Sequence, residues 1–405
     1  MSNWSDLPIE ILNLIVEHLY YIDQVRVRVV CKSWRSNIYN DGKYADKLPW
    51  ILGYQSDHAR HDDIISSSSN LIYLYEPSQK RRYRVEIPTD ITMLHASEFD
   101  STMLHASKFG WLLLSEDRMS FSRPFFFYCP FTNEFIRLPD LDKKDNLWYS
   151  QIQATFSTAP TSSDCVIFVF QPRSDPNRIR VSTCSPGDMA WSSILFTGDY
   201  WQIKNVAYAK EIFYCAFHLT FPYMGAYNPA LKEWKIHPYP PFILSLFHQQ
   251  EYSNLYLIDS PDDDKNLLLA YYSGRGLYPD CVFRFDQSQM EWFKIKNFIS
   301  VSSYNEDRHE RVKIETLNNR VLFRSSVQFI SLPAEGEANR LANTIHWCSS
   351  KRCSSARRSG GVRSCPQIYD WVDQQSDRGW SKVWIQPPHA HKFMTGRSEL
   401  ELELD

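Results

Sequence analysis

Apolar residues recur at helical spacing in the first forty positions of the chain. One stripe is formed by Ile11, Leu12, Ile15 and Leu19, and an overlapping stripe by Ile9, Leu12, Val16 and Leu19. A helix that is apolar around so much of its circumference is expected to be buried on two sides. A unit near the roughly 40-residue limit rarely covers such a surface alone, so a second protein is expected to cover one side.

Two shorter helices are predicted after the first one. Asp23 is a candidate N-cap for a helix that runs through Val30, and Ser33 is a candidate N-cap for a helix that reaches Ile38. Residues 25–29 alternate valine with arginine, which taken locally favours a strand. The flanking caps, together with the family pattern described next, favour the helix.

The amino-terminal segment ends in an apolar residue, cysteine, lysine, tryptophan and arginine in a set order. The positions that follow one known pattern are Leu7, Pro8, Glu10, Ile11, Leu12, Ile15, Leu19, Val29, Cys31, Lys32, Trp34 and Arg35. This pattern resembles the F-box. Two departures are mild: residues 20–22 fill the turn between the first two helices, and Val25 stands where leucine is usual.

The resemblance implies three helices within residues 1–42 that dock on a Skp-type adaptor. Through this adaptor the chain would join the cullin and RING subunits of a ubiquitin ligase. The residues expected in the adaptor contact or its immediate support are Leu7, Pro8, Ile11, Leu12, Ile15, Leu19, Val29, Val30, Cys31 and Trp34. The alternative is a helical bundle that serves only the core of its own chain.

The pattern changes after a predicted linker at residues 43–69, which is largely polar and contains a run of four serines. Short aromatic and aliphatic runs follow, separated by Pro, Asn, Asp and Ser. The clearest runs are 71–75, 111–114, 125–128, 166–170, 212–217, 255–258, 267–272 and 321–323. They indicate strands without long amphipathic helices between them, so residues 70–390 are predicted to be all-β.

A short motif repeats within these strands: a leading residue, usually aromatic, precedes a second aromatic residue across a turn. The copies are Tyr128 with Phe135, Tyr227 with Trp234, Phe285 with Trp292 and Cys184 with Trp191, and looser ones are Tyr75 with Tyr83 and Trp371 with Trp380. Each copy predicts a hairpin. From residue 75 to residue 285 the leading positions are 53, 56, 43 and 58 residues apart, and periods of this size are typical of propellers.

These copies resemble the kelch motif, although the usual Gly-Gly doublet occurs only at residues 360–361. Residues 110–133 and 318–333 resemble the propeller domains that follow the F-box in a large plant family of otherwise unassigned function. The expected fold class is therefore a small all-α F-box of three helices followed by an all-β, kelch-like propeller. The interval from 285 to 371 leaves the blade count open between six and seven.

Composition narrows the range of functions. The chain has 405 residues with 43% hydrophobic and 15% aromatic content, a net charge of −3 and nine cysteines. This net charge does not favour binding to nucleic acid or to an anionic membrane. The sequence shows no signal peptide and no run of apolar residues long enough to span a membrane. The odd, scattered cysteines suit a reducing compartment, so the nucleus, the cytoplasm or both are expected.

Candidate chemistry is sparse, and the sequence predicts no catalytic residue, cofactor or metal site. His95 and His105 lie in a ten-residue duplication, which is better explained as a local duplication than as a pair of metal ligands. Residues with the chemistry of metal ligands but no ligand spacing are His58, His61, Asp62, Asp63, Asp262, Asp263, Asp264, His346, Cys348, Cys353 and Cys365.

Two charged segments lie near the carboxyl terminus. The basic stretch 351–363 is predicted to be an exposed loop, with nuclear import or nucleic-acid binding as the alternative. Residues 391–405 are predicted to be a disordered acidic tail.

The predicted function is that of a substrate receptor of a Skp–cullin–F-box ubiquitin ligase. The F-box would bind the adaptor and the propeller would recruit an unknown protein for ubiquitination, without catalysis by this chain. Two alternatives stay open: an adaptor-binding protein that forms no active ligase, and a propeller that binds a small ligand.

Overall fold

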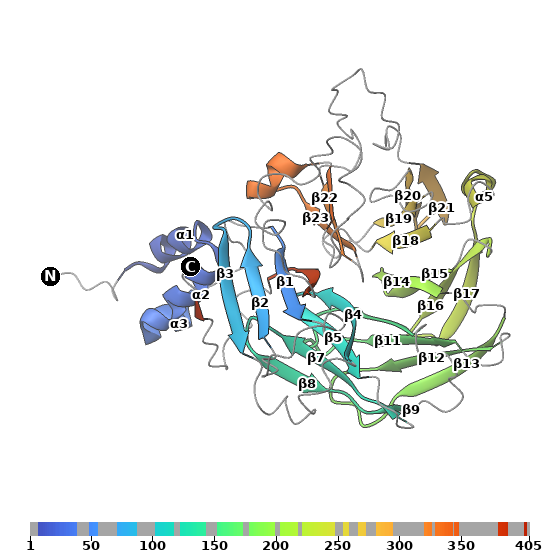
Figure 1. The fold of residues 1–405 in the computed structure, drawn as a ribbon, viewed down its shortest axis with the longest axis horizontal. Coiled ribbons are helices and arrows are strands. Elements are labelled where there is room, and N and C mark those ends of the chain that lie inside the picture. Colours follow the sequence, from blue (N-terminus) through green and yellow to red (C-terminus); the bar gives the residue numbers. More distant parts are fainter. Residues whose placement is uncertain are drawn as a thin grey trace, which may run out of the picture.

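The computed structural model describes seventeen segments of the chain. They are residues 7–38, 48–55, 71–86, 102–116, 122–142, 152–172, 178–198, 203–217, 221–247, 254–258, 266–272, 281–294, 320–325, 329–342, 344–347, 380–387 and 401–402. Within them, a small group of helices stands beside a ring of β-sheets (Figure 1).

The three predicted helices form at the amino terminus. Their bounds are α1 (Ile9–Glu17), α2 (Tyr21–Val30) and α3 (Lys32–Asn37). The prediction of a helix rather than a strand over residues 25–29 is thus confirmed. Tertiary packing decides this conformation, because a helix places Tyr21 and Val25 on one face against the core of the β-sheets.

The helix ends differ from the predicted caps. α2 begins at Tyr21, which therefore lies in the helix and not in an interhelix turn, and Asp23 sits in its first turn. α3 begins one residue after Cys31, whose Sγ accepts a hydrogen bond from the Trp34 N–H at 3.4 Å. The predicted cap Ser33 is consequently inside the helix.

The rest of the described chain forms a propeller. The first blade has the strand order β25 (Trp380–Ile385), β1 (Trp50–Gln55), β2 (Leu71–Glu76), β3 (Arg81–Glu86) and β26 (Glu401–Leu402). The second contains β4 (Thr102–Lys108), β5 (Trp111–Glu116), β7 (Phe125–Cys129) and β8 (Glu134–Arg137). The third contains β10 (Gln153–Phe156), β11 (Ile167–Pro172), β12 (Arg178–Cys184) and β13 (Ser192–Thr197).

Two further blades complete this regular series. The fourth contains β14 (Ile203–Ala209), β15 (Ile212–Phe217), β16 (Tyr223–Asn228) and β17 (Glu233–Pro238), and helix α5 (Pro241–Phe247) follows it. The fifth contains β18 (Asn254–Ile258), β19 (Asn266–Tyr272), β20 (Cys281–Asp286) and β21 (Glu291–Lys294). A small ladder joins β6 (Ser122–Arg123) to β9 (Leu141–Asp142).

The all-β propeller is confirmed, but the count of six or seven blades is wrong for the residues that the structure describes, which form five. A further sheet lies between the fifth and first blades (Figure 1) and contains β23 (Phe329–Pro333), β22 (Arg320–Arg324) and β24 (Thr344–Trp347). It lacks the antiparallel order of a blade because β24 pairs parallel to β22. A 3-10 helix, η5 (Gly336–Leu341), separates β23 from β24.

The repeated motif marks one hairpin in each of the five blades, namely β2–β3, β7–β8, β12–β13, β16–β17 and β20–β21. Its two key residues face each other across the hairpin in three copies: Tyr128 with Phe135, Tyr227 with Trp234 and Phe285 with Trp292. In four copies the turn ends in a left-handed residue, at Lys80, Asn133, Lys232 and Met290. The predicted hairpins are therefore confirmed, except that Trp371 lies outside the described residues and Trp380 begins β25.

Close packing accompanies the motif in the fourth blade. The Trp234 ring lies on Gly225, where a Cβ atom would collide with it. The same ring contacts Phe170 and Phe196 of the third blade. The third and fourth blades thus share aromatic side chains within one core cluster.

The ring closes between distant parts of the sequence. β25 pairs antiparallel with β1 from Trp50 opposite Ile385 to Gln55 opposite Trp380. β1 lies inside the range predicted as a linker, and β26, which pairs with β3, lies in the range predicted as a disordered tail. The Trp384 indole donates a 2.8 Å hydrogen bond to the Arg324 carbonyl, which ties the closing strand to β22.

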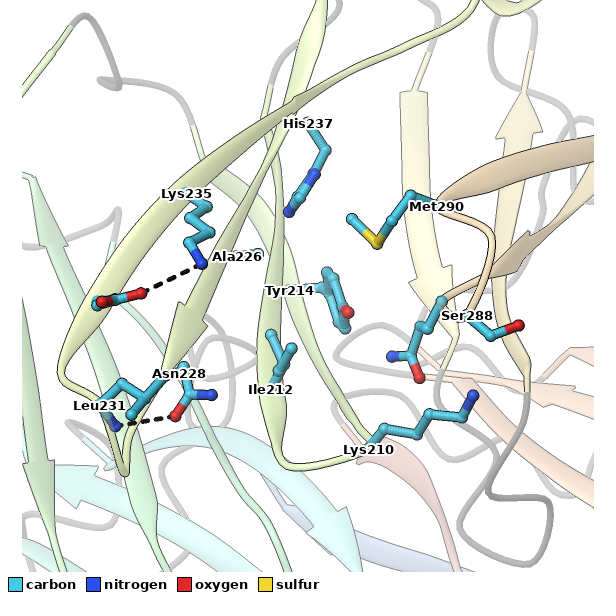
Figure 2. A pocket seen from close by; sticks show the side chains of 12 residues that line it. Lys210, Ile212, Tyr214, Ala226, Asn228, Leu231, Lys235, His237, Ser288 and Met290 are labelled. Carbon is cyan, nitrogen blue, oxygen red and sulfur yellow. Dashed lines mark hydrogen bonds and ion pairs between the residues drawn. The ribbon is translucent and has the colours of Figure 1, made fainter.

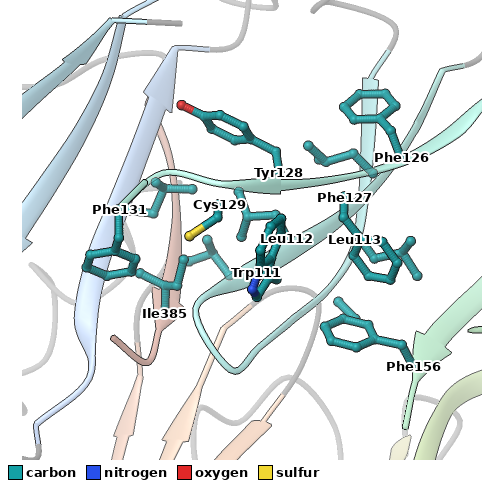
Figure 3. Close-up of a cluster of buried hydrophobic side chains, with 14 of the residues drawn as sticks. Trp111, Leu112, Leu113, Phe126, Phe127, Tyr128, Cys129, Phe131, Phe156 and Ile385 are labelled. Atoms are coloured by element: carbon teal, nitrogen blue, oxygen red, sulfur yellow. The ribbon is translucent and has the colours of Figure 1, made fainter. Parts of the chain in front are cut away.

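The largest core cluster joins the first three blades and the helices. Figure 3 shows its aromatic centre, where Trp111, Phe127 and Phe156 lie close together. The Phe127 and Phe156 rings meet edge to face with centroids 4.9 Å apart. Phe131, on the β7–β8 turn, lies at the end of this cluster nearest the helices and takes part in the contact described next.

Candidate functional site

The inner face of the helical unit has its own small core. Leu12, Val16 and Ile38 are buried together, and side chains packed against them are Leu7, Ile9, Val27 and Trp34. This accounts for one of the two apolar stripes predicted for α1. Leu12 therefore supports the helical unit from inside.

The outer face of α1 is apolar and exposed. Ile11, Leu14 and Ile15 project from it at helical spacing, and we call these three residues the α1 stripe. Leu14 was not among the predicted contact residues, although its position three residues after Ile11 could have revealed it. Val30, at the end of α2, is also exposed.

The remaining predicted contact residues are distributed between these two environments. Pro8 is exposed, whereas the partly buried residues are Leu7, Leu19, Cys31 and Trp34. The side chain of Val29 lies outside the described part of the structure. Their assignment to the adaptor contact stays a prediction.

α2 attaches the helical unit to the propeller. The buried Tyr21 ring meets Trp50 of β1 with centroids 6.0 Å apart and Phe131 with centroids 5.5 Å apart, both edge to face. Ile22 is buried beside it. Because Trp50 and Phe131 belong to the first and second blades, Tyr21 fits between two blades and fixes the direction of α2.

Polar contacts support this attachment. The Gln79 amide on the β2–β3 turn donates to the Asp23 carboxylate at 3.5 Å. The buried Gln24 amide donates to the Val16 carbonyl at 2.6 Å and to the Leu19 carbonyl at 3.3 Å, which satisfies backbone acceptors at the end of α1. α1, α2 and the propeller are therefore held as one body.

The fourth and fifth blades lie across the ring from the helices (Figure 1). A groove lies between these two blades, and Figure 2 shows the side chains that line it. It has a volume of about 400 Å³. Its lining residues are Lys210, Ile212, Tyr214, Ala226, Asn228, Leu231, Glu233, Lys235, His237, Gln287, Ser288 and Met290. They come from β15, β16, β17 and the turns of both blades, so the groove exists only when the two blades stand side by side.

Two charged groups of the groove form an ion pair. Lys235 lies 3.2 Å from the Glu233 carboxylate. Burial lowers the pKa of His237, and the nearby Lys235 lowers it further, so His237 is neutral at pH 7. The groove thus offers mainly apolar surface, with charged residues and neutral polar groups around it.

The histidines considered as metal ligands have structural roles where the structure describes them. The His105 Nε2 atom is 2.7 Å from the Ser115 hydroxyl, and its ring stacks on Phe125. His346 is buried and stacks on Phe323. The other candidate ligands fall outside the described residues, among which no group of His, Cys, Asp or Glu is placed to hold a metal ion.

These two histidines predict acid sensitivity. Burial, helped by Arg123, lowers the pKa of His105 from 6.5 to about 3, and burial lowers that of His346 to about 4. Below about pH 6.5 these histidines take up protons in the unfolded chain but stay neutral in the folded chain. Their contribution to the free energy of unfolding is therefore fully present above this pH and is lost progressively below it. The expected loss is about 1.4 kcal/mol per pH unit for each histidine.

Urea unfolding between pH 7.5 and about 5 measures this effect. The His105→Gln variant should show a shallower pH dependence than the original chain, whatever its absolute stability. Equal slopes for the two proteins would contradict the assignment to His105.

Comparison with known proteins agrees with this architecture. The F-box domain family matches residues 4–45, and the helices and propeller together make the chain an F-box protein with a propeller domain. The KIB1-4 beta-propeller family matches residues 74–370. The chain belongs to this family, and neither matching family is an enzyme family.

The relatives come from Arabidopsis thaliana. F-box/kelch-repeat protein At1g57790 is 30% identical over 240 residues, which cover 59% of this chain and 60% of that protein. F-box protein At4g00893 is 28% identical over 57% of this chain and 53% of that protein, and F-box protein At1g49360 is 25% identical over 95% and 73%. The chain thus spans less than two thirds of the first two relatives.

No helix within the described segments is long and apolar enough to cross a membrane.

Proposed function

We propose that the chain is the substrate-receptor subunit of a Skp–cullin–F-box ubiquitin ligase. The helices bind a Skp-type adaptor, which brings the cullin and RING subunits, and the propeller recruits a protein for ubiquitination. The observation that carries this proposal is the α1 stripe, an exposed apolar surface on a helical unit that α2 attaches to the propeller.

The energetics of the α1 stripe suit a protein partner. Its three aliphatic side chains are roughly half exposed, and covering them contributes on the order of 1 kcal/mol each. Contiguous apolar surface of this kind marks interaction sites. The inner stripe of the same helix is already covered, so the outer one is the side left for the adaptor.

The role of the propeller is positional. A receptor that holds a target close to a ubiquitin-charged enzyme raises the effective concentration of the target lysine. The rigid attachment of α2 to two blades supports this role, because it fixes where a bound target lies relative to the adaptor.

Reconstitution tests the proposal. The full chain is co-expressed with a Skp-type adaptor and a cullin–RING pair, and the complex is isolated through a tag on the chain. We expect all four proteins to elute together in equal amounts. Adaptor without cullin would instead support a protein that binds the adaptor outside a ligase, and the absence of both would overturn the proposal.

A further inference from the structure

The groove between the fourth and fifth blades has an exposed apolar residue on each side. Leu231 stands on the β16–β17 turn and Met290 on the β20–β21 turn, and Figure 2 shows both around the same hollow. Ile212, Tyr214 and Ala226 also line it. An apolar side chain that entered from solvent would contact both blades at once.

The charges of the groove indicate what kind of segment it accepts. Lys235 is paired with Glu233. Lys210 lies near Asp286, whose pKa is lowered first by a hydrogen bond from the Ser288 hydroxyl and further by Lys210. Counting Asp286, the two lysines are balanced by two carboxylates, so the groove has no excess positive charge to select a phosphorylated or strongly acidic segment.

A polar group is available for a peptide backbone. The Asn228 Oδ1 atom accepts hydrogen bonds from the backbone N–H groups of Ala230 and Leu231, both at 3.0 Å. This fixes the amide plane, and the side-chain nitrogen of Asn228 points away from the turn into the groove (Figure 2). It can donate to a carbonyl oxygen of a bound chain.

The position of the groove suits a recruited protein. Gln79 and Phe131, which hold α2, lie on the β2–β3 and β7–β8 turns. These turns are equivalent to the β16–β17 and β20–β21 turns, which carry Leu231 and Met290. Because the blades repeat one strand order, equivalent turns lie on one face of the propeller. The groove and the helices therefore share a face, on opposite sides of the ring.

We infer that the groove binds an uncharged segment of the protein recruited for ubiquitination, anchored by a large aliphatic or aromatic side chain between Leu231 and Met290. The volume of about 400 Å³ falls in the range of ligand pockets and admits an anchor residue with part of its neighbour. Buried anchors of this type dominate the energetics of protein interfaces. Only the statement that the bound protein is a ubiquitination target rests on the proposed function.

A random-peptide phage library, selected on the full chain, tests the inference. We expect enriched peptides that share a Leu, Ile, Met or aromatic residue in an uncharged context. Leu231→Asp and Met290→Asp should each weaken synthetic copies of these peptides at least about tenfold. Both side chains are exposed, so neither change disturbs the core.

The matched control is Leu195→Asp on β13, because Leu195 and Met290 are both 48% exposed. It should leave peptide binding unchanged. No enriched peptide, enrichment of Asp or Glu, or equal binding by the groove variants and the control would each overturn the inference. Adaptor binding by the unaltered chain is measured in parallel. If the unaltered chain does not bind the adaptor, the proposed function is overturned, whereas the peptide-binding assay tests the groove alone.

Discussion

Replacing Ile11 and Ile15 with aspartate is expected to weaken the binding of a Skp-type adaptor strongly. Both side chains lie on the exposed α1 stripe, where they are 46% and 44% exposed. The variant would remove two apolar contacts and place two carboxylates in an interface without partners, which is costly. We expect the dissociation constant to rise at least about 100-fold, as measured by calorimetric titration with purified adaptor.

A double variant on the propeller provides a matched control. Leu195 and Ile236 are 48% and 45% exposed, so Leu195→Asp with Ile236→Asp makes the same chemical change at the same degree of exposure. It should bind the adaptor as the original chain does. Circular dichroism should show equal helical content and melting for both variants. If the α1 variant bound the adaptor as tightly as the original chain, the α1 stripe would not be part of the adaptor interface.

Replacing Tyr21 with alanine is expected to release the helical unit from the propeller. Tyr21 is 1% exposed and fits between Trp50 and Phe131. Truncation of a buried aromatic side chain of this size costs about 3–5 kcal/mol. Since Tyr21 contacts aromatic side chains of two blades, we expect this loss of stability to weaken the attachment of α2 to the propeller.

Hydrogen exchange with mass spectrometry measures the attachment. Amides of α2 and of β1 should lose protection together, while those of the fourth blade keep it. Adaptor binding should persist because the α1 stripe is unchanged, but ubiquitin transfer in the reconstituted ligase should fall as the propeller loses its fixed position. Tyr21→Phe keeps the ring and should behave as the original chain. Equal protection in the Ala and Phe variants would show that the attachment does not depend on Tyr21.

The hairpins of the propeller were predictable because their signals are local. The turn between the motif residues is four residues long, and its last residue adopts a left-handed conformation at Asn133 and Met290. The facing aromatic pairs lie seven residues apart in sequence. A short stretch of chain therefore contains all the interactions that define such a hairpin.

The site was less predictable, because exposure depends on packing partners. Spacing predicted that α1 is apolar on two sides, but it did not assign Leu12 to the inner core or Leu14 to the outer stripe. The contact of Tyr21 with Phe131 joins residues 110 positions apart. The groove combines β16–β17 with the β20–β21 turn, and no single motif contains both.

The strands and the repeated hairpin followed from the sequence because each rests on contacts between residues close together in the chain, and the F-box followed from its ordered set of residues within the first forty positions. Three features became visible only in the folded structure: the described chain has five blades, β25 closes the ring against β1, and α2 is fixed between two blades. The physical reason is the pairing of β25 with β1 over more than 300 residues. Closing a loop of that length is a long-range event. Its outcome depends on which strand edges remain unpaired after the local hairpins have formed, and no local sequence pattern shows this.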